Sequence, residues 1–333
     1  MAEMRSIDIH AHLVPDCMLR VLGRGQAWHG IHGERDSRGS LVFEMAGQKM
    51  PLLSKLDWKG PQRLADMDAL GVDVQVVSTF VGYYQFAGDA EAAAACREAN
   101  DEVAQMAKEN PRRLAGFCAL PMQSVPAAVT ELERGVNRLG LKGAMIDDTV
   151  DGRTLDDPVL LPFWRAAEQL GALIFVHQGS PTLVAHRTER YHLPNTIGNL
   201  VDRAVTFASL VFGGVMDQCP ELKVCLAHGG GYTCYGIGRM DRGWQVRPEA
   251  RTKIQRPPSA YLRRFYYDCL THSETALRYL LDTVGADRVV LGSDWPADMG
   301  IDSPVEWVRQ MASLTDDEKS LILGENLEQL LEL

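Results

Sequence analysis

Two histidines with one residue between them, His10 and His12, lie at the end of the segment Ile7–His12. On a β-strand, side chains at positions i and i+2 point to the same face, so both imidazoles would project together. Imidazole nitrogens are common ligands of zinc and of similar divalent ions. The pair therefore indicates a metal site, although two histidines near a strand end can also merely form hydrogen bonds.

Three further ionisable residues each end an apolar run: His177 ends ALIFVH, His228 ends KVCLAH, and Asp294 ends RVVLGSD. The carboxyl ends of the strands in a parallel barrel meet at one mouth, where barrel enzymes place their reacting groups. Packing alone explains such a set poorly, because polar side chains buried without partners cost free energy. Together with His10 and His12, these residues predict a site for one divalent metal ion. Zn²⁺ is the expected ion and Mn²⁺ the alternative.

These five residues are one more than the four ligand positions of a catalytic zinc site, of which three are held by protein ligands and one by water. One of His177, His228 and Asp294 can therefore act as a base toward water held by the ion rather than as a permanent ligand. Histidine suits that role because its ordinary pKa lies near neutral pH. The five remaining histidines are expected on the surface or in loops; they are residues 29, 32, 186, 192 and 272.

The elements that position these residues are short β-rich runs with helical patterns between them. The expected strands are Ile7–His12, Val72–Thr79, Leu114–Leu120, Lys142–Asp147, Ala172–His177, Lys223–His228, Phe265–Leu270 and Val289–Asp294. Eight strands alternating with helices predict an α/β fold, a (β/α)8 TIM barrel. The alternative is a doubly wound open sheet, which usually carries a GxGxxG motif after its first strand; this chain has none there.

We expect a single domain over residues 1–333, because no linker and no internal repeat divides the chain. An irregular insertion at about residues 13–59 separates the first strand from the first clear helix. An insertion of this length is often a lid or a binding segment. The alternative is a surface subdomain without a role at the site.

The composition excludes several classes of function. The chain has 333 residues, 46% of them hydrophobic, which is typical of a globular protein. Its net charge of −10, with scattered basic residues, argues against a nucleic-acid partner. No apolar run approaches the roughly 18 residues of a membrane helix, and the N-terminal segment resembles neither a signal peptide nor an anchor. Seven cysteines without a CxxC pair favour reduced thiols, so we expect a cytoplasmic protein.

The motifs IDIHAH, FVH, LAHGGG and LGSDWP, in this order, resemble the amidohydrolase superfamily. More narrowly, they resemble its decarboxylase branch, typified by the α-amino-β-carboxymuconate-ε-semialdehyde decarboxylases. The resemblance covers essentially the whole chain and implies a barrel of the metal-dependent hydrolase type. It also implies that His10, His12, His177 and Asp294 bind zinc and that His228 is the general acid/base. In the related aromatic-acid decarboxylases, the aspartate ligand protonates the ring carbon.

Arg239, in GIGRMDRGW, matches a family arginine that reaches a carboxylate across a dimer interface. The resemblance thus implies a homodimer and a small-molecule carboxylic acid as substrate. A second substrate-binding arginine of the family is replaced here by Pro51, with Lys49 and Lys55 nearby. These departures indicate a related reaction on a different substrate.

The predicted activity is metal-dependent, non-oxidative decarboxylation of a small unsaturated or aromatic carboxylic acid. Protonation of the carbon creates an electron sink, so no organic cofactor is required. The same site could instead hydrolyse an amide, a lactone or a C–C bond. A metal-binding barrel without catalysis is the alternative from a different class.

Overall fold

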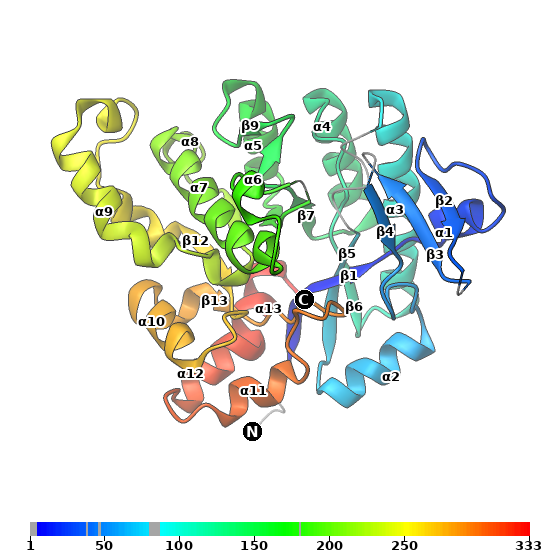
Figure 1. Cartoon of the computed structure of the whole chain (residues 1–333). Coiled ribbons are helices and arrows are strands. Elements are labelled where there is room, and N and C mark those ends of the chain that lie inside the picture. Colours follow the sequence, from blue (N-terminus) through cyan, green and yellow to red (C-terminus); the bar gives the residue numbers. More distant parts are fainter. Residues whose placement is uncertain (1–4, 38, 46–47, 80–86, 180) are drawn as a thin grey trace.

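The structure, a computed structural model, describes residues 5–37, 39–45, 48–79, 87–179 and 181–333. Eight short parallel strands lie at its centre (Figure 1). They are β1 (Ile7–Leu13), β5 (Val74–Thr79), β6 (Leu114–Gly116), β7 (Gly143–Ile146), β10 (Leu173–Val176), β11 (Lys223–Leu226), β12 (Phe265–Asp268) and β13 (Val289–Val290). Each falls within, or within one residue of, an expected strand.

The strands form a closed ring. One sheet has the order β1-β5-β6, and a second has the order β13-β12-β11-β10-β7. Single parallel bridges join the two sheets, one between Cys118 and Ala144 and the other between Ala11 and Trp295. The predicted (β/α)8 barrel is thus confirmed, and the open sheet is excluded because the first strand pairs with the segment after the last.

Helices surround the barrel and follow its strands (Figure 1). The longer ones are α2 (Pro61–Leu70), α3 (Asp89–Glu109), α4 (Val125–Arg134), α5 (Leu161–Gln169), α7 (Asn199–Phe212), α9 (Thr233–Val246) and α10 (Glu274–Val284). The shorter ones are α6 (Ala185–Thr188), α8 (Val215–Gln218), α11 (Pro304–Gln310), α12 (Asp316–Ser320) and α13 (Asn326–Leu331). A two-residue antiparallel pair, β8 (Thr149–Val150) and β9 (Arg153–Thr154), follows β7.

The segment 13–59 contains regular structure rather than one long loop. Helix α1 (Asp16–Leu22) precedes an antiparallel sheet of β2 (His32–Arg35), β3 (Leu41–Met45) and β4 (Gln48–Pro51). Buried apolar side chains from this segment form a core cluster with alanines of α3, so the segment packs against the outside of the barrel. Figure 1 shows it beside α3.

Strand β10 shows how the barrel aims side chains at its mouth. Ile174 and Val176 pack with helix residues in the outer core, whereas Leu173 and Phe175 belong to a second buried cluster. Successive residues of a strand point to opposite faces, so the next residue on the side of Phe175 is His177. The ring of Phe175 contacts that of His10, with 5.0 Å between their centroids. This alternation places His177 at the carboxyl end of the barrel interior.

Candidate metal centre

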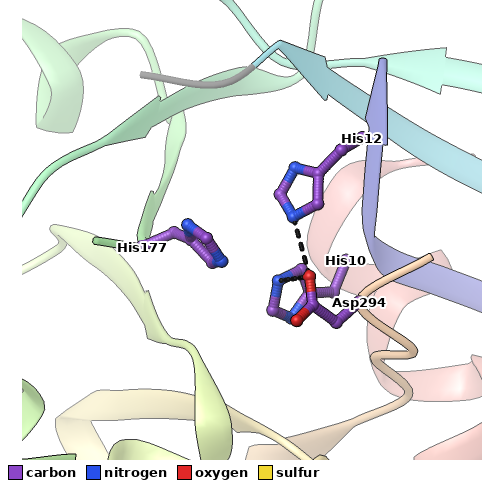
Figure 2. A group of neighbouring side chains, drawn as sticks. All are labelled: His10, His12, His177 and Asp294. Atoms are coloured by element: carbon purple, nitrogen blue, oxygen red, sulfur yellow. Dashed lines mark hydrogen bonds and ion pairs between the residues drawn. The ribbon is translucent and has the colours of Figure 1, made fainter. Parts of the chain in front are cut away.

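Four of the predicted site residues come together at the barrel mouth. His10, His12, His177 and Asp294 are all buried, and one potential ligand atom from each lies within 4.8 Å of the others. They come from β1 and from the turns that follow β10 and β13 (Figure 2). The structure thus unites residues that are up to 284 positions apart in the sequence.

Asp294 is central to this cluster. Its Oδ1 lies 3.2 Å from Nε2 of His10 and 3.1 Å from Nε2 of His12. The ring of His177 completes the group, with its centroid 4.8 Å from that of His10. Figure 2 shows the three imidazoles around the carboxylate.

Each imidazole has a partner at the nitrogen that faces away from the centre. Nδ1 of His10 lies 2.8 Å from Oδ2 of Asp268, and Nδ1 of His177 lies 3.0 Å from the backbone oxygen of Gln178. Nδ1 of His12 lies 3.3 Å from Oγ of Ser78. The acceptors at His10 and His177 require a proton on Nδ1, which leaves the lone pair on Nε2. Metal-binding histidines are held in this way, because the outer hydrogen bond sets the tautomer and the ring orientation.

The cluster fits a divalent cation. Nε2 of His177 is buried and has no hydrogen-bond partner among the described residues, and the buried Nε2 of His10 faces Oδ1 of Asp294 at 3.2 Å. Burial by itself lowers the pKa of His10, but the carboxylates of Asp294 and Asp268 outweigh burial and raise that pKa to about 10. The surroundings of His10 therefore favour positive charge at its ring. Three imidazoles and a carboxylate are a suitable donor set for a first-row divalent ion.

The other two histidines of the cluster have the protonation state that ligation needs. Burial lowers the pKa of His12, and it lowers the pKa of His177 well below the ordinary value. Both imidazoles are consequently neutral at pH 7. Neutral imidazole is the form that binds metal ions.

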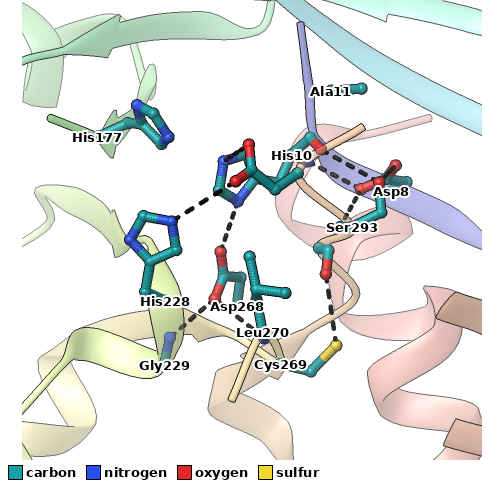
Figure 3. A network of polar contacts seen from close by, with 12 residues as sticks. Asp8, His10, Ala11, His177, His228, Gly229, Asp268, Cys269, Leu270 and Ser293 are labelled. Carbon is teal, nitrogen blue, oxygen red and sulfur yellow. Dashed lines mark hydrogen bonds and ion pairs between the residues drawn. The ribbon is translucent and has the colours of Figure 1, made fainter. Parts of the chain in front are cut away.

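His228 lies beside this cluster rather than within it. Its Nε2 is 4.0 Å from Oδ2 of Asp294, and its ring centroid is 5.4 Å from those of His10 and His177. Burial lowers its pKa, so the imidazole is neutral at pH 7. This position suits a group that exchanges protons with a bound molecule (Figure 3).

The backbone at His228 and Asp294 is unusual. Both residues have a positive φ, 57° for His228 and 60° for Asp294. This left-handed region is rare for residues with a Cβ, and such residues often occur at functional sites. On β11, Val224 and Leu226 pack in the outer core, so continued strand geometry would send residue 228 outward as well. The left-handed turn instead brings His228 beside the cluster.

The glycines after His228 allow the chain to turn there. Gly231 has φ 58°, and a Cβ at this position would lie only 2.3 Å from the backbone oxygen of Leu200. A side chain at residue 231 would therefore collide with α7. This contact explains Gly231 as a requirement for close packing.

The sequence analysis missed Asp268, the last residue of β12. It is fully buried, and its carboxylate accepts hydrogen bonds from Nδ1 of His10 and from the backbone N–H of Gly229, both at 2.8 Å. Figure 3 shows that it connects His10 with the turn that carries His228. Its signal in the sequence was the same as that of His177, a polar residue near the end of an apolar strand.

A cavity of about 760 Å³ opens beside His228 and Asp294. Parts of α7, α9 and α10 form its walls, together with the turns after β11, β12 and β13. His272 also lines this cavity, and it is exposed in the loop between β12 and α10, as the sequence predicts. None of the described residues of segment 13–59 lines it.

The predicted substrate-binding cations lie elsewhere in this chain. Arg239 is exposed on α9 and does not line the cavity. Lys49 forms an ion pair with Glu34, and Lys55 forms one with Asp66 at 2.9 Å. Neither lysine is among the residues that line the cavity.

None of the helices in the described part of the chain is both long enough and apolar enough to cross a membrane.

Comparison with known proteins places these observations in a family. The family model described as amidohydrolase matches residues 7–333. The 2-amino-3-carboxymuconate-6-semialdehyde decarboxylase of Dictyostelium discoideum is 32% identical over 332 residues, covering 98% of this chain and 91% of that protein. The gamma-resorcylate decarboxylase of a Rhizobium species is 31% identical over 259 residues, covering 74% of this chain and 79% of that protein.

The fold is also found among solved structures. The dihydroxybenzoic acid decarboxylase of a Polaromonas species, solved with bound manganese and the inhibitor 2-nitroresorcinol, has a TM-score of 0.81 and 24% identity. The match covers 99% of this chain and 98% of that one. At this identity the likeness supports the barrel fold.

Proposed function

The chain belongs to the amidohydrolase family, and we propose that it is a metal-dependent carboxy-lyase that removes CO2 from a small unsaturated or aromatic carboxylic acid. The observation that carries this proposal is the convergence of His10, His12, His177 and Asp294 next to His228 and an open cavity. The decarboxylase names of its relatives support the same reaction.

We assign His10, His12, His177 and Asp294 as the residues that hold the ion. A divalent ion supplies positive charge that binds the substrate carboxylate and offsets the charge that develops during the reaction. We propose Zn²⁺ because the set of three imidazoles and one carboxylate is typical of zinc. Mn²⁺ is the alternative, and the Polaromonas enzyme was solved with it. Elemental analysis of protein purified without added metal distinguishes the two.

Decarboxylation requires a proton on the carbon that loses CO2. The C–C bond to the carboxylate breaks, and its electron pair returns to the protonated carbon skeleton. His228 and Asp294 both line the cavity, and their side chains face each other at 4.0 Å. We propose that this pair moves the proton: His228 Nε2 takes a proton from solvent, Asp294 passes it to the carbon, and the loss of CO2 returns both groups to their starting charge.

We further propose a cytoplasmic homodimer. Arg239 is exposed and forms no ion pair with any described residue, so its guanidinium is available to a second copy. There it would bind the substrate carboxylate of the neighbouring site, for which its fork geometry is suited. All seven cysteines are free of disulfides, which supports a reducing compartment. Sedimentation analysis tests the dimer, and mixing inactive His228→Ala and Arg239→Ala chains tests the shared site through regained activity.

Two products separate the proposed reaction from hydrolysis at the same site. The metal-loaded protein is incubated with unsaturated and aromatic acids, and also with amides and lactones, while released CO2 and newly formed acid are measured. Release of CO2 that depends on His228 supports the carboxy-lyase. Acid formation from an amide or lactone without CO2 would favour the hydrolase, and neither product would contradict both.

A further inference from the structure

The cavity beside His228 and Asp294 bears on the chemical class of the substrate, an inference that rests on the proposed function. Its volume of about 760 Å³ falls within the range of roughly 300–1,000 Å³ in which proteins bury whole drug-sized ligands. A single-ring acid placed against Asp294 would leave most of this space to water. The size therefore indicates a substrate with a further group beyond its reacting end.

The walls of the cavity are mainly apolar. Leu200 of α7, Leu280 of α10 and Leu270 after β12 line it, and the last two are buried. Tyr232 and Tyr279 stand at its opening with 37% and 45% of their surface exposed. The hydroxyl of Tyr279 donates to the backbone oxygen of Cys234 at 3.0 Å, which holds its ring against the opening. Exposed aromatic groups gathered at one mouth often mark a binding site.

The cavity offers no cation for a second acidic group. Neither Lys nor Arg occurs among its described lining residues, whose ionisable groups are Asp294, the imidazoles of His228 and His272, three tyrosines and Cys234. A carboxylate buried in this cavity would lack a partner, and an unpaired buried charge is strongly unfavourable.

Neutral polar groups are nevertheless present. The amides of Asn195 and Asn199 line the cavity and form no hydrogen bonds with the described residues. They can donate to or accept from an uncharged oxygen, such as a hydroxyl or a carbonyl. A neutral oxygen substituent is thus compatible with these walls, whereas an anionic one is not.

We propose that the substrate is a monocarboxylic acid whose uncharged, extended apolar or aromatic part fills the cavity between α7, α9 and α10. Its one carboxylate lies at the metal centre. The remainder packs against Leu200, Leu270 and Leu280 and reaches the tyrosines at the opening.

Binding of a matched series of acids tests the proposal without requiring turnover. The probes are 2-hydroxybenzoate, its 4-phenyl and 5-phenyl derivatives, and the same biphenyls with a carboxylate on the outer ring. Calorimetry with the metal-loaded protein measures each dissociation constant. We expect at least one phenyl derivative to bind about tenfold tighter than 2-hydroxybenzoate, because the added ring is buried. The second carboxylate should abolish this gain.

Variants of residues at the opening of the cavity test where the phenyl group binds. Tyr279→Ala should weaken binding of the phenyl derivative severalfold more than it weakens binding of 2-hydroxybenzoate, whereas Tyr279→Phe should retain the ring contact. Tyr191→Ala is the matched control, because Tyr191 is 79% exposed and does not line the cavity. Equal binding of 2-hydroxybenzoate and both phenyl derivatives would overturn the proposal.

Tighter binding of the dicarboxylates would also overturn it and would implicate a cation from outside the cavity, such as Arg239 of a second copy. The outcomes separate this inference from the proposed function. If the phenyl group tightens binding but no acid releases CO2, the carboxy-lyase fails and the cavity assignment stands. If CO2 is released from single-ring acids but the phenyl group does not tighten binding, the cavity assignment fails and the carboxy-lyase stands.

Discussion

Asp268 accepts a hydrogen bond from Nδ1 of His10 at 2.8 Å, and both side chains are fully buried. The other oxygen of Asp268 accepts from the N–H of Gly229, next to His228. One carboxylate thus orients a candidate metal ligand and also holds the turn that carries the candidate base. Figure 3 shows this link between the two parts of the centre.

Replacing Asp268 with asparagine should weaken metal binding. An amide cannot provide the same charged acceptor at both positions, and loss of such an outer partner typically costs roughly 10- to 100-fold in metal affinity. Titration against a chelator measures this change, with a thermal melt to check folding. Asp282→Asn is the control, because among the described residues Asp282 forms an ion pair with Arg278 alone, at the surface. Unchanged affinity in Asp268→Asn would refute the positioning role.

Replacing a candidate metal ligand should lower the metal content of the protein. We expect His177→Ala and Asp294→Ala to be purified with clearly less than one metal ion per chain, because each removes one of four donors that face one point. Elemental analysis gives the metal content. His272→Ala should keep full occupancy, since His272 lines the cavity but lies outside the cluster. Full occupancy in His177→Ala would contradict its assignment.

His228→Ala should separate chemistry from metal binding. The imidazole lies beside the cluster, so its loss should leave the metal content intact. Loss of a positioned proton-transfer group typically costs about 10²- to 10⁴-fold in rate. Released CO2 and metal content measured on the same sample test this expectation. Wild-type turnover would remove His228 from the mechanism.

The activity should persist into mildly acidic solution. Burial lowers the pKa of His228, so the folded protein keeps this imidazole neutral at the ordinary histidine pKa of about 6.5. As the pH falls further, the ring gains a proton and can no longer act as a base. We therefore expect kcat/KM to be constant near pH 7 and to decline only below about 6.5. Metal content must be followed in parallel, and a decline that begins above pH 7 would contradict the assignment.

Chelation should abolish CO2 release reversibly. Dialysis against a strong chelator removes the ion, and the neutral donors of His12 and His177 remain ready to bind it again. Addition of Zn²⁺ or Mn²⁺ should restore activity, and the better of the two identifies the preferred ion. Full CO2 release by metal-free protein would refute the metal-dependent mechanism.

Several parts of the centre could be predicted from local patterns. His10 and His12 share a face because a strand alternates with a period of two. His177 continues the inward side of β10 for the same reason. These residues belong to different strands, but all parallel strands of a barrel end at the same mouth. The grouping follows from strand geometry together with the closed fold.

Other parts depended on contacts that no local pattern describes. Asp268 is 258 residues from His10, and only the closed barrel makes it the acceptor of that imidazole. His228 would face outward on a regular strand, and a left-handed backbone brings it to the centre. The exposed position of Arg239 likewise followed from the way α9 packs.

The sequence by itself determined the eight strands, the barrel and the histidines and aspartate at its mouth, because apolar runs and the alternation of side chains along a strand are local properties of the chain. Tertiary structure alone decided which side chains orient those histidines, how His228 reaches the centre, and that a large cavity without cations lies next to it. Such features arise where segments distant in the chain pack together, so their geometry is set by the closed barrel and its surrounding helices.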